Sequence, residues 1–300
     1  MACRGVLQYA PTKTMNYLKK IYHVGELVKF SHTIFALPFA LASLLVASGG
    51  RPPARLLLLV IAAMVTARTA AMAFNRWIDA DFDARNPRTA TRHIPAGLLS
   101  KRFVLLVSLG SAILFVLVTY WINPLVFRLS PIALLILFGY SYTKRFTALS
   151  HLVLGLALGI APIGAWIAAR GSFELAPILL GIAVLFWVAG FDMIYATQDA
   201  EFDRQTGLHS LVVALGIPRA LYGARLLHLL TLTLLIWFGS YNHLTLAYYV
   251  CLVGVGILLA YEHSLVSPQN LSRVNAAFFT INGFISLLYL SGVAYSLLIS

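Results

Sequence analysis

The chain has 300 residues, of which 60% are hydrophobic and only 11% are charged, and its formal net charge at pH 7 is +12. A typical soluble domain is about 45–50% apolar and about 25% charged, so this composition argues against a soluble enzyme and indicates a membrane protein. The two cysteines, Cys3 and Cys251, lack the spacing of a zinc site or a disulfide framework.

The chain begins with a basic segment. Residues 1–25 contain no acidic residue and carry Arg4, Lys13, Lys19 and Lys20. The segment lacks the Arg and Ser richness of a transit peptide, so we interpret it as a cytoplasmic tail ahead of one domain, residues 26–300. MNYLKKI at Met15 resembles a natural start, and residues 1–14 are expected to add nothing to the fold.

Apolar runs near spanning length recur from about residue 31 to the end of the chain. A spanning helix needs about 20 mostly apolar residues. By that criterion the predicted spans are 31–48, 56–76, 103–121, 124–142, 150–169, 177–198, 219–239, 245–261 and 276–298. We therefore expect an all-α membrane protein with about nine transmembrane helices.

The basic residues predict the orientation of these spans. With a cytoplasmic N-terminus, the loops on the opposite side hold only Arg51, Arg55, Arg128 and Arg170, and most of the 22 Lys and Arg residues lie on the cytoplasmic side. The positive-inside rule therefore favours this topology. The charge is explained by topology and attraction to anionic lipid or substrate, without nucleic-acid binding.

Most of the ten acidic residues gather in two clusters, one ending the second predicted span and one ending the sixth. DADFD at Asp79–Asp83 resembles DAEFD at Asp199–Asp203. Four spans separate the clusters, so the chain resembles a repeat of four-helix units. Such repeats commonly hold the working site where their halves meet.

Helical geometry divides each cluster. At about 100° per residue, Asn75, Asp79 and Asp83 share one face and Asp81 lies on the other side. The corresponding stripe of the second cluster holds Asp192, Tyr195, Asp199 and Asp203, with Glu201 opposite. Acidic residues in spanning helices are costly, which makes these stripes functional candidates.

Two facing carboxylate stripes repel one another unless a cation lies between them. Mg²⁺ typically binds one or two carboxylates together with substrate phosphate oxygens. Basic residues follow the same spans in sequence: Arg85, Arg88, Arg92, Lys144, Arg145 and Arg204. Carboxylates, a metal and cations together indicate a diphosphate site.

These residues resemble the motifs of the UbiA-type intramembrane prenyltransferases. The motif NxxxDxxxD is matched by Asn75, Asp79 and Asp83, and DxxYxxxDxxxD by FDMIYATQDAEFD. NPRTATRHIPAG (86–97) and GYSYTKRFT (139–147) match further, and the likeness extends from FSHTIFALPFAL to the last span. Four linked motifs in order are far more specific than a single DxxxD.

The resemblance implies a helical bundle around a central cavity in a bacterial inner membrane, with the active site on the cytoplasmic side. It also implies Mg²⁺-dependent transfer of a polyprenyl chain from its diphosphate to an aromatic acid. The implied metal residues are Asn75, Asp79, Asp83, Asp192, Asp199 and Asp203. The implied diphosphate, acceptor and reaction-centre residues are Lys29, Arg88, Arg92, Tyr140, Ser141, Lys144, Arg145 and Tyr195.

The identity of the acceptor stays open at this point. The best-known members prenylate 4-hydroxybenzoate on the route to ubiquinone. HTIFALPFAL and MAFNRWIDADFDARNPRTA resemble instead a branch linked to menaquinone made through futalosine, whose acceptor is 1,4-dihydroxy-6-naphthoate. Both acceptors are aromatic carboxylates, which a Lys or Arg near the site would suit.

Two other functional classes share some of these features. A transporter would also have intramembrane acids and a repeat, but its acids are expected near the bilayer midplane rather than beside arginines at helix ends. A CDP-alcohol phosphotransferase would carry a compact DGxxAR-type run, which the sequence lacks.

Several polar residues are expected to have ordinary roles. Asp81 and Glu201 should face solvent or basic loops, and His93, His151, His209 and His228 have no mutual metal-ligand spacing. Gly155, Gly159 and Gly164 are expected to permit close helix packing.

Overall fold

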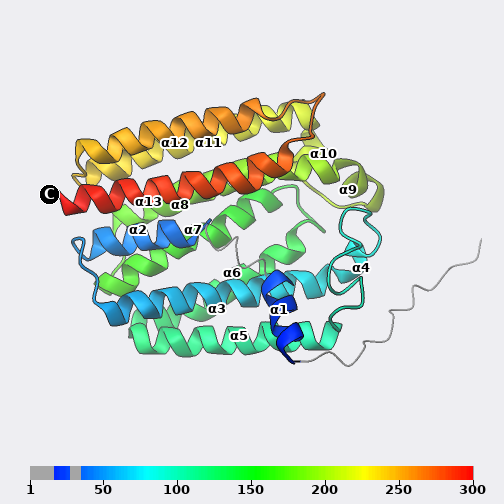
Figure 1. The fold of residues 1–300 in the computed structure, drawn as a ribbon, viewed down its shortest axis with the longest axis horizontal. Helices are drawn as coiled ribbons and strands as arrows, with labels where there is room; N and C mark the ends of the chain where they lie inside the picture. The colour runs from blue at the N-terminus through cyan, green and yellow to red at the C-terminus, as the bar shows by residue number, and fades with distance from the viewer. Residues whose placement is uncertain (1–16, 28–34, 300) are drawn as a thin grey trace, which may run out of the picture.

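The computed structural model describes residues 17–27 and 35–299 (Figure 1). Its α-helices are α1 (Tyr17–Leu27), α2 (Leu37–Ala47), α3 (Ala54–Ile78), α4 (Ala80–Asp83), α5 (Lys101–Ile122), α6 (Pro124–Thr143), α7 (Ser150–Arg170), α8 (Leu175–Ala196), α9 (Ala200–Thr206), α10 (Leu211–Leu215), α11 (Ile217–Tyr241), α12 (Leu246–Ser264) and α13 (Asn282–Leu298). A 3-10 turn, Thr197–Asp199, precedes α9, and a π-helix, Ala276–Ile281, precedes α13. The all-α architecture predicted from the sequence is confirmed.

Eight helices in the described part of the chain are long and apolar enough to cross a membrane. They are α3, α5, α6, α7, α8 with its extension through α9, α11, α12 and the helix that ends as α13. The predicted first span, 31–48, is described as a helix only over the 11 residues of α2. The predicted count of nine is therefore not reached within these residues.

The long helices form two units that share a pattern of contacts. In the first unit α3 packs on α5, and in the second α8 packs on α11. The leading helices of the two units, α2 and α7, pack on each other, and α13 joins α2 to α12. This arrangement agrees with the predicted repeat of four-helix units.

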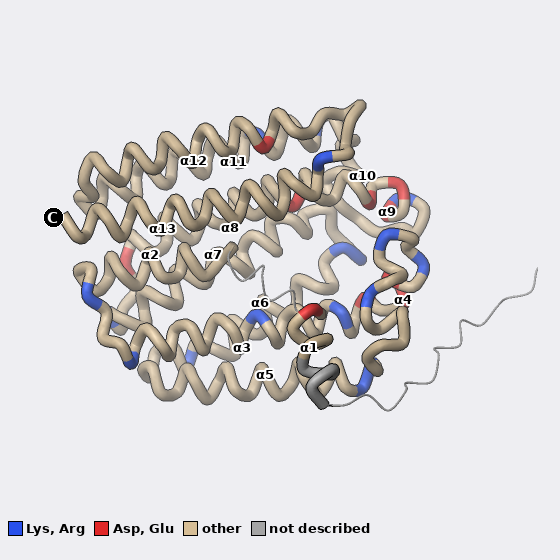
Figure 2. The backbone as a smooth tube through the Cα atoms, viewed as in Figure 1, with Lys and Arg blue, Asp and Glu red and all other residues tan. Residues whose placement is uncertain are grey.

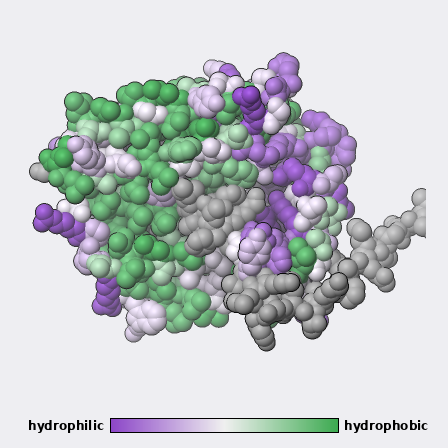
Figure 3. Space-filling view, in the orientation of Figure 1, coloured by the Kyte–Doolittle hydropathy of each residue, from purple (hydrophilic) through white to green (hydrophobic). Residues whose placement is uncertain are grey.

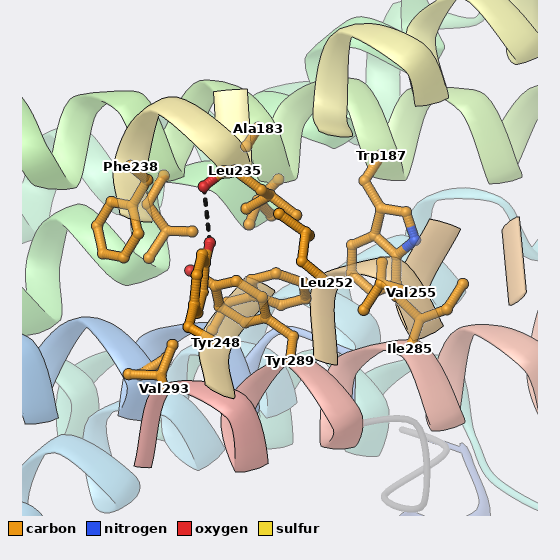
Figure 4. Packing of buried hydrophobic residues seen from close by; sticks show 14 of the residues in the cluster. Ala183, Trp187, Leu235, Phe238, Tyr248, Leu252, Val255, Ile285, Tyr289 and Val293 are labelled. Atoms are coloured by element: carbon orange, nitrogen blue, oxygen red, sulfur yellow. Dashed lines mark hydrogen bonds between the residues drawn. The ribbon is translucent and has the colours of Figure 1, made fainter. Parts of the chain in front are cut away.

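The main apolar core lies between α8, α11, α12 and α13 (Figure 4). Trp187, Tyr248 and Tyr289 are buried there, and the Tyr248 hydroxyl donates a 2.7 Å hydrogen bond to the Leu235 carbonyl. That bond satisfies a polar group that would be costly to bury unpaired. The core therefore joins helices of the second unit to α13.

Glycine spacing explains why α7 and α8 approach closely. A Cβ on Gly155 would lie 2.3 Å from the Leu185 carbonyl oxygen, and one on Gly159 would lie 2.5 Å from that of Gly181. The packing prediction is thus confirmed at these two positions. It is wrong for Gly164, where a Cβ would meet nothing within 4 Å.

Residues 17–27, which overlap the predicted tail of residues 1–25, form a helix that the sequence reasoning did not identify. Val24 and Leu27 of α1 pack with Trp77, Ile94 and Leu99. Helix α1 therefore lies against α3 and the segment between α4 and α5.

Charged and apolar surfaces separate clearly. Lys, Arg, Asp and Glu gather at the end of the bundle that carries α4, α9 and α10 (Figure 2). The visible face along the helices is mainly hydrophobic, and hydrophilic residues cover that same end (Figure 3). The two acidic clusters thus lie at one end of a membrane-spanning bundle.

Candidate active site

Each acidic cluster begins at a joint between two helices. Helix α3 ends at Ile78, and Asp79 has φ −93° and ψ 1° before α4 starts. Helix α8 ends at Ala196, and Asp199 has φ −102° and ψ 1° before α9 starts. These values lie in the sparsely populated bridge region, where many active-site residues are found. The sequence repeat is therefore also a repeat of local backbone geometry.

The first joint does not break the register of the stripe. The Asp79 amide donates to the Asn75 carbonyl at 3.0 Å, and the Asp83 amide donates to the Asp79 carbonyl at 2.8 Å. These i to i−4 bonds keep the three side chains on one face. The Asn75 amide nitrogen Nδ2 also donates to Asp79 Oδ2 at 2.9 Å.

One cavity of about 630 Å³ joins the two clusters. The described candidates that line it are Asn75, Asp79, Asp83, Arg88, Arg92, Tyr140, Ser141, Lys144, Arg145, Asp192, Tyr195, Asp199 and Asp203. Lys29, the remaining candidate, lies outside the described residues. The stripes predicted to face one another therefore share one cavity.

Cations hold the carboxylates of the first cluster. Arg145 Nη2 lies 3.4 Å from Asp79 Oδ1 and donates to the Ile78 carbonyl at 3.0 Å. Arg92 Nη1 donates to Asp83 Oδ1 at 2.6 Å. The guanidinium of Arg145 therefore also fixes the end of α3.

Cations from the first half of the chain hold the carboxylates of the second cluster. Arg88 donates through Nε to Asp199 Oδ1 at 2.8 Å, and its Nη2 bonds Asp199 Oδ2. Lys144 Nζ donates to Asp203 Oδ2 at 3.3 Å. The two halves are thus linked through their charges at the site.

Asn86 explains how the loop reaches across to the second half. Its Oδ1 accepts the Arg88 backbone N–H at 3.0 Å, which forms an Asx turn around Pro87. Its Nδ2 donates to Asp199 Oδ1 at 3.0 Å. Asn86 therefore shapes the turn that carries Arg88 and contacts the same carboxylate.

The surroundings of Asp79 and of Arg88 shift the pKa values of these two side chains. Burial and the neighbouring Asp83 carboxylate raise the pKa of Asp79 to about 6. Burial would lower the pKa of Arg88, but its hydrogen bonds to Asp199 outweigh burial and raise it. A cation close to Asp79 would offset the repulsion between the Asp79 and Asp83 carboxylates.

Tyr195 and Phe278 line the cavity, and a buried histidine contacts the cavity residue Asp192. The Tyr195 hydroxyl accepts a hydrogen bond from Arg88 Nη1 at 2.8 Å, and the Tyr195 ring lies 4.2 Å from that of Phe278. His151 Nδ1 lies 2.6 Å from Asp192 Oδ2, and the His151 side chain is fully buried. Asp192 therefore has a histidine partner rather than one of the site's arginines.

The polar residues predicted to point away from the site do so. The side chains of Asp81 and Glu201 are 70% and 69% exposed. Asp81 pairs with Lys101 and Glu201 with Arg204, at 2.8 and 2.9 Å. Arg85 donates to the Asp81 carbonyl and lies over the Phe82 ring.

Sequence reasoning did not assign a role to three residues that line this cavity, Asn86, Arg68 and Arg76, or to His151, which contacts Asp192. Asn86 stood within NPRTATRHIPAG, so its motif was a usable signal. Arg68 and Arg76 lie on α3 and line the cavity, and in the sequence they stand only as basic residues within and at the end of the predicted span 56–76. His151 had no sequence signal, because its partner Asp192 is 41 residues away.

The donor set fits a hard divalent cation. The cavity offers carboxylate and amide oxygens, the ligands that Mg²⁺ takes, and its cations can hold phosphate oxygens. Asp83 Oδ2 is buried without a hydrogen-bond partner among the described residues. A buried carboxylate oxygen in that state is suited to a metal ligand.

Comparisons with known proteins identify the family. The sequence model of the UbiA prenyltransferase family matches residues 36–288. The 4-hydroxybenzoate octaprenyltransferase of Edwardsiella ictaluri (strain 93-146) is 32% identical over 261 residues, 85% of this chain and 88% of that protein. The enzyme of the same name from Tolumonas auensis is 32% identical over 91% of this chain and 94% of that protein.

Solved structures share the fold. The apo structure of a UbiA homolog from Aeropyrum pernix K1 has a TM-score of 0.80 and 32% identity, covering 87% of this chain and 96% of that one. A UbiA homolog from Archaeoglobus fulgidus, solved bound to GPP and Mg²⁺, has a TM-score of 0.74 and 19% identity, covering 93% and 100%.

Proposed function

The chain belongs to the UbiA prenyltransferase family and is a prenyltransferase, and from this premise we propose that it transfers a polyprenyl chain from its diphosphate to 4-hydroxybenzoate with Mg²⁺. The observation that carries the proposal is the cavity in which the two acidic stripes meet Arg88, Arg92, Lys144 and Arg145. Relatives from bacteria are named 4-hydroxybenzoate octaprenyltransferases, and an archaeal homolog binds GPP and Mg²⁺, which supports this acceptor and this metal.

We propose that Mg²⁺ is held by Asn75, Asp79, Asp83, Asp199 and Asp203, with Asp192 in support. When bound, the ion would neutralise negative charge on the diphosphate as it leaves. The oxygens of both stripes line the cavity and the unpartnered Asp83 Oδ2 is available to it.

The basic residues would bind the diphosphate. Arg88 and Arg92 lie on the loop after α4, and Lys144 and Arg145 follow α6, so the four cations approach from two sides. Arginine forks match phosphate oxygens bidentately, and charge stabilisation at a buried site lowers the barrier to departure of the diphosphate.

The allylic carbocation would form beside aromatic side chains. Tyr140, Tyr195, Phe278 and Phe279 line the cavity, and ring faces stabilise cations by about 0.5–2 kcal/mol each. Ser141 lies near Asn75, with 3.5 Å between the hydroxyl and Nδ2. The apolar residues contributed by α3, α5, α6 and α7 would hold the isoprenoid tail.

The acceptor needs a cation for its carboxylate and a base for its ring proton. Arg68 lies on the same face of α3 as Asn75, about two turns deeper in the cavity, and we propose that it binds the carboxylate. Asp192, oriented by His151, would take the proton released when the ring carbon is alkylated.

We also propose that the protein lies in a bacterial inner membrane with its N-terminus and active site on the cytoplasmic side. The positive-inside rule supports this orientation, because Lys and Arg concentrate at the end of the bundle that carries the acidic clusters (Figure 2).

The experiment is a transfer assay with purified protein, geranyl diphosphate and 4-hydroxybenzoate, with product mass as the readout. We expect product only when Mg²⁺ is present, and loss of at least about a hundredfold in rate for Asp79→Ala with Asp199→Ala. The matched control is Asp81→Ala with Glu201→Ala, which changes the exposed acids of the same two motifs and should keep the rate.

A second assay with a panel of aromatic acceptors tests whether the enzyme prefers a benzoate or a naphthoate. We expect 4-hydroxybenzoate to be prenylated in preference to 1,4-dihydroxy-6-naphthoate at equal concentration. Preference for the naphthoate would overturn the acceptor, and full activity of the Asp79→Ala, Asp199→Ala protein would overturn the proposed site.

A further inference from the structure

A group of metal-ligating side chains lies outside the cavity, between α1 and the segment that follows α4. His23 and Glu26 are three residues apart on α1, so they share one face of that helix. His93 comes from the segment between α4 and α5. One ligand atom from each of the three residues lies within 4.8 Å of the other two.

The distances from the Glu26 carboxylate to the two histidine nitrogens fit a tetrahedral metal site. Glu26 Oε2 lies 3.2 Å from His23 Nδ1 and 3.4 Å from His93 Nε2. Ligands about 2.0–2.1 Å from Zn²⁺ at the tetrahedral angle are separated by about 3.3 Å. A charge-assisted hydrogen bond between imidazolium and carboxylate is shorter, about 2.7–2.9 Å. The observed separations therefore suit two ligands of one ion better than two strong hydrogen bonds.

The chemistry of the donors selects the ion. Two imidazole nitrogens and one carboxylate oxygen form a common ligand set for Zn²⁺, with a water in the fourth position. Mg²⁺ prefers oxygen ligands in octahedral geometry, so it belongs to the acidic cavity instead. We propose that His23, Glu26 and His93 form a second metal site, which binds a zinc-class divalent ion.

The position of the site gives the ion a structural role. Val24 and Leu27 of α1 already pack against Ile94, which follows His93. The same segment carries Arg88 and Arg92, which hold Asp199 and Asp83. A metal bridge would therefore fasten α1 to the segment that supplies two cations of the candidate active site.

The three side chains are accessible to an ion from solution. The exposed fractions of His23, Glu26 and His93 are 20%, 44% and 19%. Partial exposure allows entry of the ion, while the flanking apolar contacts keep the two elements together.

Zinc binding to the full-length protein tests this site. The protein is purified with Asp79→Asn and Asp199→Asn so that the acidic cavity binds metal weakly, stripped with a chelator, and dialysed against ZnCl₂ alone. We expect one zinc per chain by elemental analysis. Co²⁺ in its place should give the intense visible absorption of a tetrahedral complex.

Three further variants are compared in that background. Glu26→Gln and His93→Asn should each weaken zinc binding by at least about tenfold, as loss of a metal contact does. His243→Asn is the matched control, because His243 is an exposed histidine in a left-handed turn that asparagine tolerates. It should bind zinc as the parent does.

Folding of each variant is checked by its elution profile and by its unfolding temperature without metal. Zinc should raise the unfolding temperature of the parent but not that of Glu26→Gln, which keeps the size of the side chain. Failure of the parent to bind zinc, or unchanged affinity in folded Glu26→Gln protein, would overturn the proposal. Neither readout requires prenyl transfer, so the result is independent of the proposed function.

Discussion

Arg88 makes the most extensive polar contacts of any cation in the described site. Its guanidinium donates hydrogen bonds to both Asp199 oxygens and to the Tyr195 hydroxyl. The Arg88 Cζ atom also lies 5.2 Å from the centroid of the Tyr195 ring. A planar fork can satisfy these contacts together, whereas an ammonium group cannot. The planar shape of the Arg88 guanidinium is therefore needed for these contacts in addition to its charge.

Replacement of Arg88 by lysine tests that geometry. We expect Arg88→Lys to lower kcat/KM by about ten- to a hundredfold, since a hydrogen bond to a charged group contributes about 1.5–3 kcal/mol. Arg204→Lys is the control, because Arg204 pairs only with the exposed Glu201 in the described structure. Equal kcat/KM for Arg88→Lys and the parent would contradict the role given to the fork.

Prediction at the residue scale worked where partners share a motif and failed where they do not. The stripe Asn75, Asp79 and Asp83 follows from helical periodicity alone. The pairs of His151 with Asp192 and of His93 with Glu26 join residues 41 and 67 positions apart. No local pattern encodes such distances, so these pairs required the fold.

Helices α7 and α8 show how small residues position larger elements. Gly155 and Gly159 let α7 approach the backbone of α8. His151 lies in the first turn of α7 and Asp192 lies on α8, so this close approach brings the two side chains together. Packing between the helices is thus directly connected to the site.

A pair of alanine substitutions separates packing from helix propensity. Gly155→Ala should destabilise the protein by about 1–3 kcal/mol, because its Cβ would overlap the Leu185 carbonyl and the helices must separate. Gly164→Ala meets nothing within 4 Å and should be neutral or stabilising by up to about 1 kcal/mol. Thermal unfolding in one detergent measures both, and equal stability of the two variants would contradict the packing argument.

The elements themselves were largely predictable, and their joints were not. Apolar runs near 20 residues predicted the long helices, because a bilayer leaves few other ways to satisfy the backbone. The backbone turns at Asp79 and Asp199, the π-helix before α13 and helix α1 carry no comparable hydropathy signal. The two backbone turns and the π-helix depend on the packing around them, and α1 is too short and too polar to resemble a span.

Across the whole molecule, charge defines two unlike ends. Both acidic clusters and most of the described basic residues lie at the end with α4 and α9, while the turns between α2 and α3 and between α7 and α8 lie at the other (Figure 2). A bilayer placed around the helices would therefore have the candidate active site near one surface and the turns after α2 and α7 near the other.

Cysteine labelling tests the proposed orientation. In a background of Cys3→Ser and Cys251→Ala, Glu201→Cys and Ser172→Cys lie at exposed positions at opposite ends of α8. On intact cells a membrane-impermeant maleimide should label Ser172→Cys at once and Glu201→Cys only after permeabilisation. The reverse pattern would place the active site outside the cytoplasm.

The ion pairs inside the cavity have a consequence for the order of binding. Asp79, Asp83, Asp199 and Asp203 each lie against a different cation, so the resting site neutralises itself. A metal arriving alone would compete with these cations for most of the carboxylate oxygens, and a diphosphate arriving alone would compete with the carboxylates for the cations. When both arrive, each releases what the other needs, and by linkage the gain in affinity is the same in both directions. We therefore expect the metal and the prenyl diphosphate to bind more tightly together than either does alone.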